Sequence, residues 1–235
     1  MRVNNWSIFI QSLLFPRHCA LCGSTLDQQT DFCPGCQADL PFNRQACPIC
    51  ALPVAGIGGL PCGRCSRRPP PFATSQVPLR YASPFNHLIG EFKFQHKLHL
   101  AGLLSRLFCD QLPSTLALPD LIVPVPLHPH RLRERGFNQS LELARGVAAE
   151  LDLKIDRRSC RRIRATPPQS GLDKTARSKN LRAAFVADAC LSGRHVALLD
   201  DVITTGATVT AASQALLRAG ASRVDVWALA RTSLP

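Results

Sequence analysis

The stretch V-A-L-L-D-D-V-I-T-T-G-A-T-V-T, Val196 to Thr210, decides the fold that we predict for this chain. Its four leading apolar residues are typical of a strand buried on both faces of a sheet. Two carboxylates, Asp200 and Asp201, follow where we expect that strand to end, before a hydroxyl-rich turn. The apolar residues after the turn recur at helical spacing: Val209, Ala212, Leu216 and Leu217.

The turn between the predicted strand and helix has the chemistry of a phosphate site. The N-terminus of a helix presents free backbone N–H groups and partial positive charge, which favour a phosphate. Gly206 allows a positive φ and a close approach of the backbone to a ligand, and the Thr hydroxyls can donate to phosphate oxygens. The two carboxylates repel a phosphate and instead suit a ribose diol, or a Mg²⁺ ion beside it. The stretch therefore predicts a sugar-phosphate site.

Residues 196–208 resemble the signature with which type I phosphoribosyltransferases bind 5-phosphoribosyl-1-pyrophosphate (PRPP). The match covers the apolar run, Asp-Asp, two apolar residues, Thr-Thr-Gly, one variable residue and Thr. The resemblance implies that Asp200 and Asp201, the candidate catalytic pair, bind the ribose hydroxyls. It assigns the 5′-phosphate of PRPP to the turn: Thr204, Thr205, Gly206, Ala207 and Thr208. A strand-turn-helix with a polar cap and no ligand is the competing interpretation.

Composition and charge indicate a folded, basic protein. Hydrophobic residues make up 46% of the 235 residues, which is enough for a packed core in one medium domain plus a small one. The formal net charge is +12, and residues 131–182 alone carry a net +8. This excess favours polyanionic partners such as PRPP or nucleic acid, although a merely solvated basic surface explains it as well. The aromatic residues near the basic segment are Phe137 and Phe185, so we expect little base stacking.

The N-terminus is apolar only over a short stretch. No run of about eighteen apolar residues occurs, so no transmembrane segment is predicted. The usual cleavage site of a secretion signal is also lacking, and we expect a cytoplasmic protein. Apolar residues between Trp6 and Phe15 follow helical spacing and predict a short amphipathic helix that packs on the protein, with contact to a membrane surface as the weaker alternative.

Four C-x-x-C pairs lie within residues 19–65. Such a turn places two thiolates at the spacing that one tetrahedral Zn²⁺ requires, so we predict two structural zinc sites. We assign the first two pairs to one site and the last two to the other; an interleaved pairing is the alternative. A disulfide framework is disfavoured because the chain lacks a secretion signal. The predicted ligands are Cys19, Cys22, Cys33, Cys36, Cys47, Cys50, Cys62 and Cys65.

The order of these features predicts an α/β fold in two parts. A small Cys-rich double zinc-ribbon module with the N-terminal helix spans residues 1–68, and a Pro-rich linker spans residues 69–78. A type I phosphoribosyltransferase-like domain spans residues 79–235. In it, the strand-helix-strand order that ends at Arg223 to Ala230 requires a parallel sheet flanked by helices.

Two further basic segments are candidate parts of the site. After a predicted strand over Asp120 to Pro126, a Pro-punctuated turn followed by arginines suits a pyrophosphate, because guanidinium groups pair with phosphate oxygens in fixed geometry. The phosphoribosyltransferase family has a pyrophosphate loop after an early strand, which supports this assignment. The residues are Arg131, Arg133, Arg135 and Gly136. The basic cluster around Lys93 is interpreted as a solvated face.

Residues 157–182 are too polar for a core. They lie where related transferases carry a mobile catalytic loop that closes on PRPP, and a solvated basic loop is the alternative. The candidate contacts of the mobile loop are Arg164, Gln169, Arg177 and Asn180.

Over its full length the chain resembles the ComF family and, within it, the DNA-utilisation proteins. The multi-Cys module, V-P-V-P-L-H-P, R-G-F-N-Q-S and L-L-D-D-V-I-T-T-G-A-T carry that resemblance. It implies a role in the uptake or use of external DNA, with PRPP, Mg²⁺ and zinc bound, and with single-stranded DNA and the DNA-uptake machinery as partners. Two functions stay open. The protein is either a phosphoribosyltransferase that acts on PRPP, or a non-catalytic nucleic-acid-binding accessory that uses the fold as sensor or scaffold.

Overall fold

The computed structural model describes residues 17–26, 30–56, 59–164 and 184–233, so the helix predicted between Trp6 and Phe15 lies outside the described residues. The strands are β1 (Arg17–His18), β2 (Thr25–Leu26), β3 (Ser75–Gln76), β4 (Leu79–Arg80), β5 (Leu121–Pro124), β6 (Lys154–Ile155), β7 (Cys160–Arg162), β8 (Phe185–Ala187), β9 (His195–Ile203) and β10 (Arg223–Arg231). The helices are α2 (Pro34–Ala38), α3 (Gly63–Arg67), α4 (Phe85–Phe94), α5 (Leu100–Cys109), α6 (Pro129–Arg135), α7 (Gln139–Leu151), the 3₁₀ helix η1 (Ala189–Leu191) and α9 (Ala207–Arg218).

Within the described residues, six strands form one parallel sheet with β9 near its middle. The order is β3-β10-β9-β5-β6, and β4 pairs with β10 beyond β3. Leu198 of β9 lies opposite Val226 of β10 and Val123 of β5. Residues Val196 to Leu199 are at most 2% exposed. The predicted strand buried on both faces is therefore confirmed.

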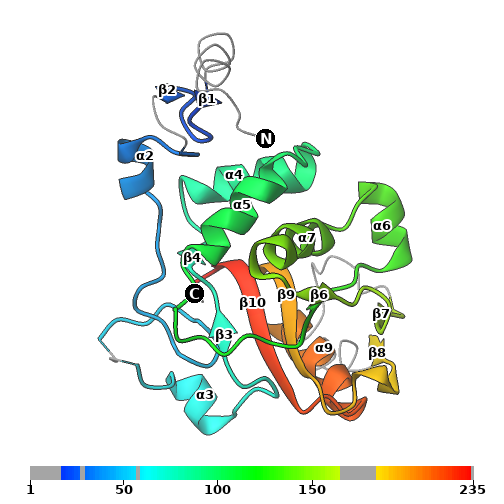
Figure 1. Ribbon diagram of the computed structural model, residues 1–235. Coiled ribbons are helices and arrows are strands. Elements are labelled where there is room, and N and C mark those ends of the chain that lie inside the picture. Colours follow the sequence, from blue (N-terminus) through cyan, green and yellow to red (C-terminus); the bar gives the residue numbers. More distant parts are fainter. Residues whose placement is uncertain (1–16, 27–29, 57–58, 165–183, 234–235) are drawn as a thin grey trace, which may run out of the picture.

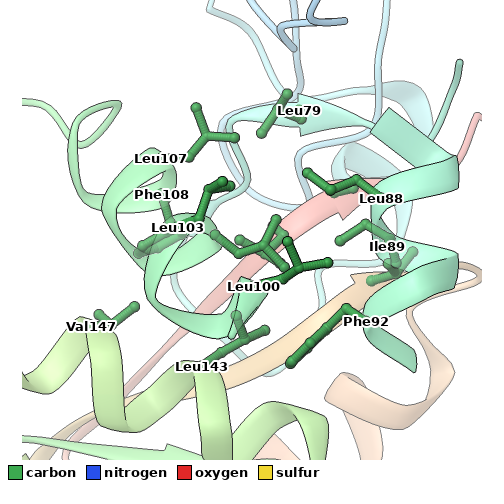
Figure 2. Close-up of a cluster of buried hydrophobic side chains, with 14 of the residues drawn as sticks. Leu79, Leu88, Ile89, Phe92, Leu100, Leu103, Leu107, Phe108, Leu143 and Val147 are labelled. Carbon is green, nitrogen blue, oxygen red and sulfur yellow. The ribbon is translucent and has the colours of Figure 1, made fainter. Parts of the chain in front are cut away.

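Helices cover both faces of this sheet, with α4, α5 and α7 on one face and α9 on the other (Figure 1). The alternation of side chains along β9 divides the core: Ala197 and Leu199 pack with the first group of helices, and Val196 and Leu198 pack with α9. Figure 2 shows how side chains of α4, α5 and α7 point toward one another over the sheet. The predicted parallel sheet flanked by helices is confirmed. No helix in the described ranges has both the length and the apolar character needed to cross a bilayer.

The chain leaves the neighbouring strands β5 and β9 in opposite directions. From β5 it passes through α6 and α7 to β6 on one side, and from β9 it passes through α9 to β10 on the other. In open α/β sheets, ligands bind in the crevice outside the carboxyl ends of two such strands. The topology therefore places the expected ligand site beyond Pro124 and Ile203.

Several elements differ from their predicted boundaries. Strand β9 continues past Leu199 to Ile203, because Val202 and Ile203 still have partners in β10. The turn predicted after β5 contains the helix α6. Part of the segment predicted as a polar loop forms β7, which pairs with β8 outside the main sheet. Ser75–Gln76, which the sequence placed in the linker, forms β3 at the edge of the sheet.

Candidate functional site

Asp200 and Asp201 lie near the carboxyl end of β9, and other elements hold both carboxylates. Ser140, in the first turn of α7, donates its hydroxyl to Asp200 Oδ1 at 3.0 Å. Lys93, near the end of α4, forms an ion pair with Asp201, with Nζ 2.9 Å from Oδ2. The side chains of Lys93 and Asp201 are only 16% and 11% exposed, so solvent screens this pair less than a surface pair. The acidic pair is thus oriented by α4 and α7.

The protonation of Asp200 is strongly affected by its surroundings. Burial and the adjacent Asp201 carboxylate raise the pKa of Asp200 to about 7, while Lys93 and the Ser140 hydroxyl act in the opposite direction. Burial and a neighbouring like charge both disfavour the ionised carboxylate. Such shifts cluster at functional sites, because a group that titrates near neutrality responds readily to a bound charge.

The turn Thr204–Thr208 joins β9 to α9 directly after the acidic pair. Gly206 has φ = +80° and immediately precedes the first residue of α9. Glycine adopts this left-handed conformation without steric penalty. Thr205 Oγ1 accepts a hydrogen bond from the Ala207 N–H at 3.3 Å. The N-terminus of α9 therefore opens onto the turn, where its first N–H groups can meet an anion.

The N-Q-S part of the R-G-F-N-Q-S motif, residues 138–140, makes specific contacts at the start of α7. Asn138 caps the helix: its side-chain oxygen accepts from the Ser140 N–H at 3.0 Å, and its amide donates to the Val125 carbonyl at 3.1 Å. Gln139 is buried and donates to the Lys93 carbonyl at 3.4 Å. These contacts tie α7 to the end of β5 and to α4. They place Ser140 and Lys93 beside β9.

The residues predicted to bind pyrophosphate lie on and after α6. Gly136 ends this helix with φ = +73°. The Arg135 guanidinium lies 5.5 Å from the centre of the Phe94 ring, Arg131 pairs with Glu134 at 3.4 Å, and Arg133 is exposed. The structure therefore places a basic surface beside the end of α4.

The predicted mobile loop is only partly described. Arg164 is exposed, whereas Gln169, Arg177 and Asn180 lie outside the described residues. Strands β7 and β8 pair antiparallel on either side of this segment, with Arg162 opposite Phe185. The assignment of these contacts stays a prediction.

The eight predicted zinc ligands form two compact groups. Within each group the four Sγ atoms lie within 4.8 Å of one another, which fits one tetrahedral ion with Zn–S bonds of about 2.3 Å. The sequential pairing predicted from the sequence is confirmed. The first group is Cys19, Cys22, Cys33 and Cys36, and the second group is Cys47, Cys50, Cys62 and Cys65.

In each group, backbone N–H groups favour the thiolate of one cysteine. The Cys33 N–H donates to Cys19 Sγ at 3.4 Å, and the Cys62 N–H donates to Cys47 Sγ at 3.3 Å. Burial acts to raise the pKa of Cys19, but backbone donors outweigh it and lower that pKa to about 6. The same balance lowers the pKa of Cys47 to about 7. Because zinc binds the thiolate, both groups suit structural Zn²⁺ with no open coordination position.

Comparisons with known proteins agree with this arrangement. The double zinc ribbon domain family matches residues 10–66. The DNA utilization protein YhgH of Escherichia coli K12 is 39% identical over 226 residues, which cover 94% of this chain and 99% of that protein. The chain belongs to the ComF family. Another ComF relative, Competence protein F of Haemophilus influenzae, is 32% identical over 228 residues, covering 92% of this chain and 98% of that protein.

Among solved structures, the glutamine PRPP amidotransferase of B. subtilis is similar to this ComF chain with a TM-score of 0.36 and 19% identity. The similarity covers 56% of this chain and 25% of that enzyme, so the chain spans about a quarter of its length. The predicted parallel sheet flanked by helices and preceded by a double zinc ribbon is confirmed.

Three residues beside the acidic pair of this ComF protein were missed as site residues. Lys93 was interpreted as part of a solvated face, and Ser140 as the start of a helix. Arg162 was assigned to a basic loop, but it lies close to Asp200. Burial lowers the pKa of Arg162, and the Asp200 carboxylate opposes this shift. The one available signal was the place of Ser140 at the end of R-G-F-N-Q-S, a polar motif directly before an apolar helix.

Proposed function

We propose that this protein binds PRPP together with Mg²⁺ at the carboxyl end of β9, as part of the utilisation of external DNA. The observation that carries the proposal is the acidic pair, held by Ser140 and Lys93, directly before a glycine turn that opens α9. The names of the ComF relatives, DNA utilization protein and competence protein, support the cellular context.

The parts of PRPP match the groups around this site. The turn and the N-terminus of α9 suit the 5′-phosphate, because they offer N–H and hydroxyl donors. Asp200 and Asp201 suit the two ribose hydroxyls as hydrogen-bond acceptors. We assign the pyrophosphate to the positive charge of Lys93 and Arg162 beside the acidic pair, together with the arginines of α6. Arg162 and Lys93 thereby join the residues that the sequence assigned.

Mg²⁺ fits the acidic pair as a hard cation that prefers oxygen ligands. Asp200 is desolvated beside a second carboxylate, and a divalent ion there would offset the charge that raises its pKa. Asp200 and Asp201 would hold the ion, and the ion would neutralise part of the pyrophosphate charge. Departure of pyrophosphate leaves oxocarbenium-like charge on the ribose, and the nearby arginines would stabilise the leaving group. A non-catalytic sensor would use the same contacts, so ligand binding is the property to test first.

Isothermal titration with PRPP should show binding that depends on Mg²⁺. Asp201→Asn should weaken it by at least about tenfold, roughly 1.4 kcal/mol, because the variant loses an acceptor for the ribose and the partner of Lys93. Asp188→Asn is the matched control, since Asp188 is an exposed carboxylate that pairs with Arg161. Its affinity should equal that of the wild type. An absence of PRPP binding by the wild-type protein with Mg²⁺ would refute the proposal.

A second function, binding of single-stranded DNA, is favoured by an exposed aromatic side chain within the basic surface. Phe94 is 66% exposed beside the Arg135 guanidinium, and Leu98 and Leu132 are also exposed. Phe137 and Phe185, the aromatic residues considered from the sequence, are both buried. Phe94 therefore offers the face on which a base can stack, a contact worth about 1–3 kcal/mol per base.

Fluorescence anisotropy with a labelled oligonucleotide across a salt series tests this function. Log affinity should fall steeply with log salt, because binding releases counterions from the DNA phosphates. Replacing Arg157, Arg158 and Arg161 by Ser should flatten the slope; Arg162 is left intact because of its proximity to Asp200. Phe94→Ala should weaken binding at every salt concentration, and Phe94→Trp should retain it. An affinity independent of salt would show that the charge excess is a solvated surface.

A further inference from the structure

A buried arginine connects the second Cys₄ group to the turn after β9. Arg231, the last residue of β10, is 2% exposed. Its Nε donates to the carbonyl of Cys50, one of the predicted zinc ligands, at 3.2 Å. Its Nη1 donates to the Ile203 carbonyl at 2.9 Å and to the Thr204 carbonyl. One guanidinium thus bridges the zinc module and the first residues of the turn.

A second arginine makes the next contact along the turn. Arg64 lies in α3 between the predicted ligands Cys62 and Cys65, and its Nη1 donates to the Thr205 carbonyl at 3.3 Å. Together, Arg231 and Arg64 hold the three successive carbonyls of Ile203, Thr204 and Thr205. The turn therefore rests on the second Cys₄ group through two side chains.

Holding these carbonyls also fixes the donors of the turn. In a planar trans peptide the C=O and the following N–H point in opposite directions. The three carbonyls share their peptide groups with the N–H groups of Thr204, Thr205 and Gly206. These N–H groups therefore point away from the two arginines, toward the side where a phosphate would bind.

The charge of the second group complements these arginines. Arg231 donates to the backbone carbonyls of Cys50, Ile203, Thr204 and Thr232, and its guanidinium also interacts with the Cys50 side chain. A guanidinium buried among carbonyls keeps its full positive charge, and a nearby negative charge lowers the free-energy cost of that burial. Four thiolates around one Zn²⁺ carry a net charge of about −2, so a loaded second group would supply it.

The first Cys₄ group lies elsewhere in the molecule. Its β1, β2 and α2 lie beside α4 and α5, whereas α3 of the second group lies near β3 (Figure 1). Cys19 packs in the core cluster of α4, α5 and α7, and Asp31 forms an ion pair with Arg106 of α5 at 2.9 Å. This group is attached to the helices rather than to the turn.

We propose that the second Cys₄ group, through the positioning residues Arg231 and Arg64, sets the conformation of the phosphate-binding turn, and that the two zinc sites therefore have separate roles. The first site stabilises the module. The second site also orients the turn, so loss of its zinc weakens phosphate binding. The role in binding rests on the proposed PRPP site, whereas the role in ordering the turn does not.

Cys36→Ser and Cys65→Ser form a matched pair, because each removes one thiolate from one group. Metal analysis should give about two zinc ions per wild-type chain and about one in each variant. Hydrogen exchange of the amides of residues 203–208 should accelerate by about tenfold or more in Cys65→Ser and stay unchanged in Cys36→Ser. PRPP affinity should fall by about tenfold or more in Cys65→Ser and remain at the wild-type value in Cys36→Ser.

Arg231→Lys tests the coupling when a cysteine variant fails to fold. It keeps the charge but loses the planar fork that reaches Cys50 and the turn together. It should retain two zinc ions and still show faster exchange at residues 203–208. Equal exchange in Cys36→Ser and Cys65→Ser, or wild-type exchange in Arg231→Lys, would overturn the inference. A wild-type protein that binds no PRPP refutes the proposed function alone, because hydrogen exchange still decides the coupling.

Discussion

Replacing Gly206 by valine is expected to abolish PRPP binding. Gly206 has φ = +80°, a conformation that is a genuine outlier for a β-branched residue. A Cβ built at this position would have Ile203 Cγ2 as its nearest neighbour, at 4.0 Å, so the protein has room for it. The effect therefore comes from the backbone, which must rotate away from positive φ and turn the first N–H groups of α9 out of place. We expect a loss of more than about a hundredfold, roughly 3 kcal/mol, by isothermal titration.

Gly193→Val is the matched control for this substitution. Gly193 also has a positive φ, +73°, and open space around its Cβ position, but it lies before the amino end of β9. Both variants should lose stability through the same strain, and thermal unfolding measures that loss. PRPP affinity should fall only in Gly206→Val. Equal affinities in Gly206→Val and the wild type would show that the turn does not bind the phosphate.

The features that the sequence predicted correctly are those encoded by near neighbours in the chain. The apolar run Val196 to Leu199 predicts a buried strand without knowledge of its partners, and the periodic residues after Gly206 predict α9. The assignment of cysteine pairs to zinc sites could also be predicted, because two consecutive C-x-x-C pairs form one site over a short loop. In each case the local structure is determined by residues that are close together in the sequence.

The missed features depend on contacts between distant elements. Lys93 pairs with Asp201 across 108 positions of sequence, and this pairing depends on how α4 packs over β9. Arg231 is the last residue of a strand, where a charged residue is usually exposed; its burial results from carbonyls supplied by the zinc module and by the turn. The extension of β9 to Ile203 depends likewise on partners in β10. Local periodicity carries no information on such long-range register.

PRPP affinity should rise with pH up to about 7 and then level off. Burial and the Asp201 carboxylate raise the pKa of Asp200 to about 7 in the free protein. Mg²⁺ or ribose hydroxyls favour the ionised carboxylate, so binding at lower pH must displace a proton. Affinity should therefore fall by up to about tenfold for each pH unit below 7. The phosphate of PRPP also titrates near pH 6 and adds its own pH dependence to the affinity. The Asp200→Asn variant should keep only this part of the pH dependence. A wild-type profile that matches Asp200→Asn would rule out Asp200 as the titrating group.

The same shift predicts how stability depends on pH. The pKa of Asp200 is 3.8 in an unperturbed chain and about 7 in the folded protein. Between these values the folded state keeps a proton that the unfolded state has lost, so stability falls as the pH rises from about 4 to about 7. Asp200→Asn removes this penalty and should be more stable than the wild type above pH 7, by on the order of 2 kcal/mol.

Asp156→Asn should change the stability in the opposite direction, and denaturant unfolding of both variants measures the two effects. Burial acts to raise the pKa of Asp156, but hydrogen bonds from the Ser159 hydroxyl and from the N–H groups of Ser159 and Arg158 outweigh it and lower that pKa. Ionised Asp156 therefore stabilises the fold, and its replacement should destabilise the protein at neutral pH. If Asp200→Asn also destabilised the protein at pH 8, ionised Asp200 would be favourably held in the free protein. Lys93 and Ser140 would then outweigh the burial and the repulsion from Asp201, and the site would be charged before any ligand arrives.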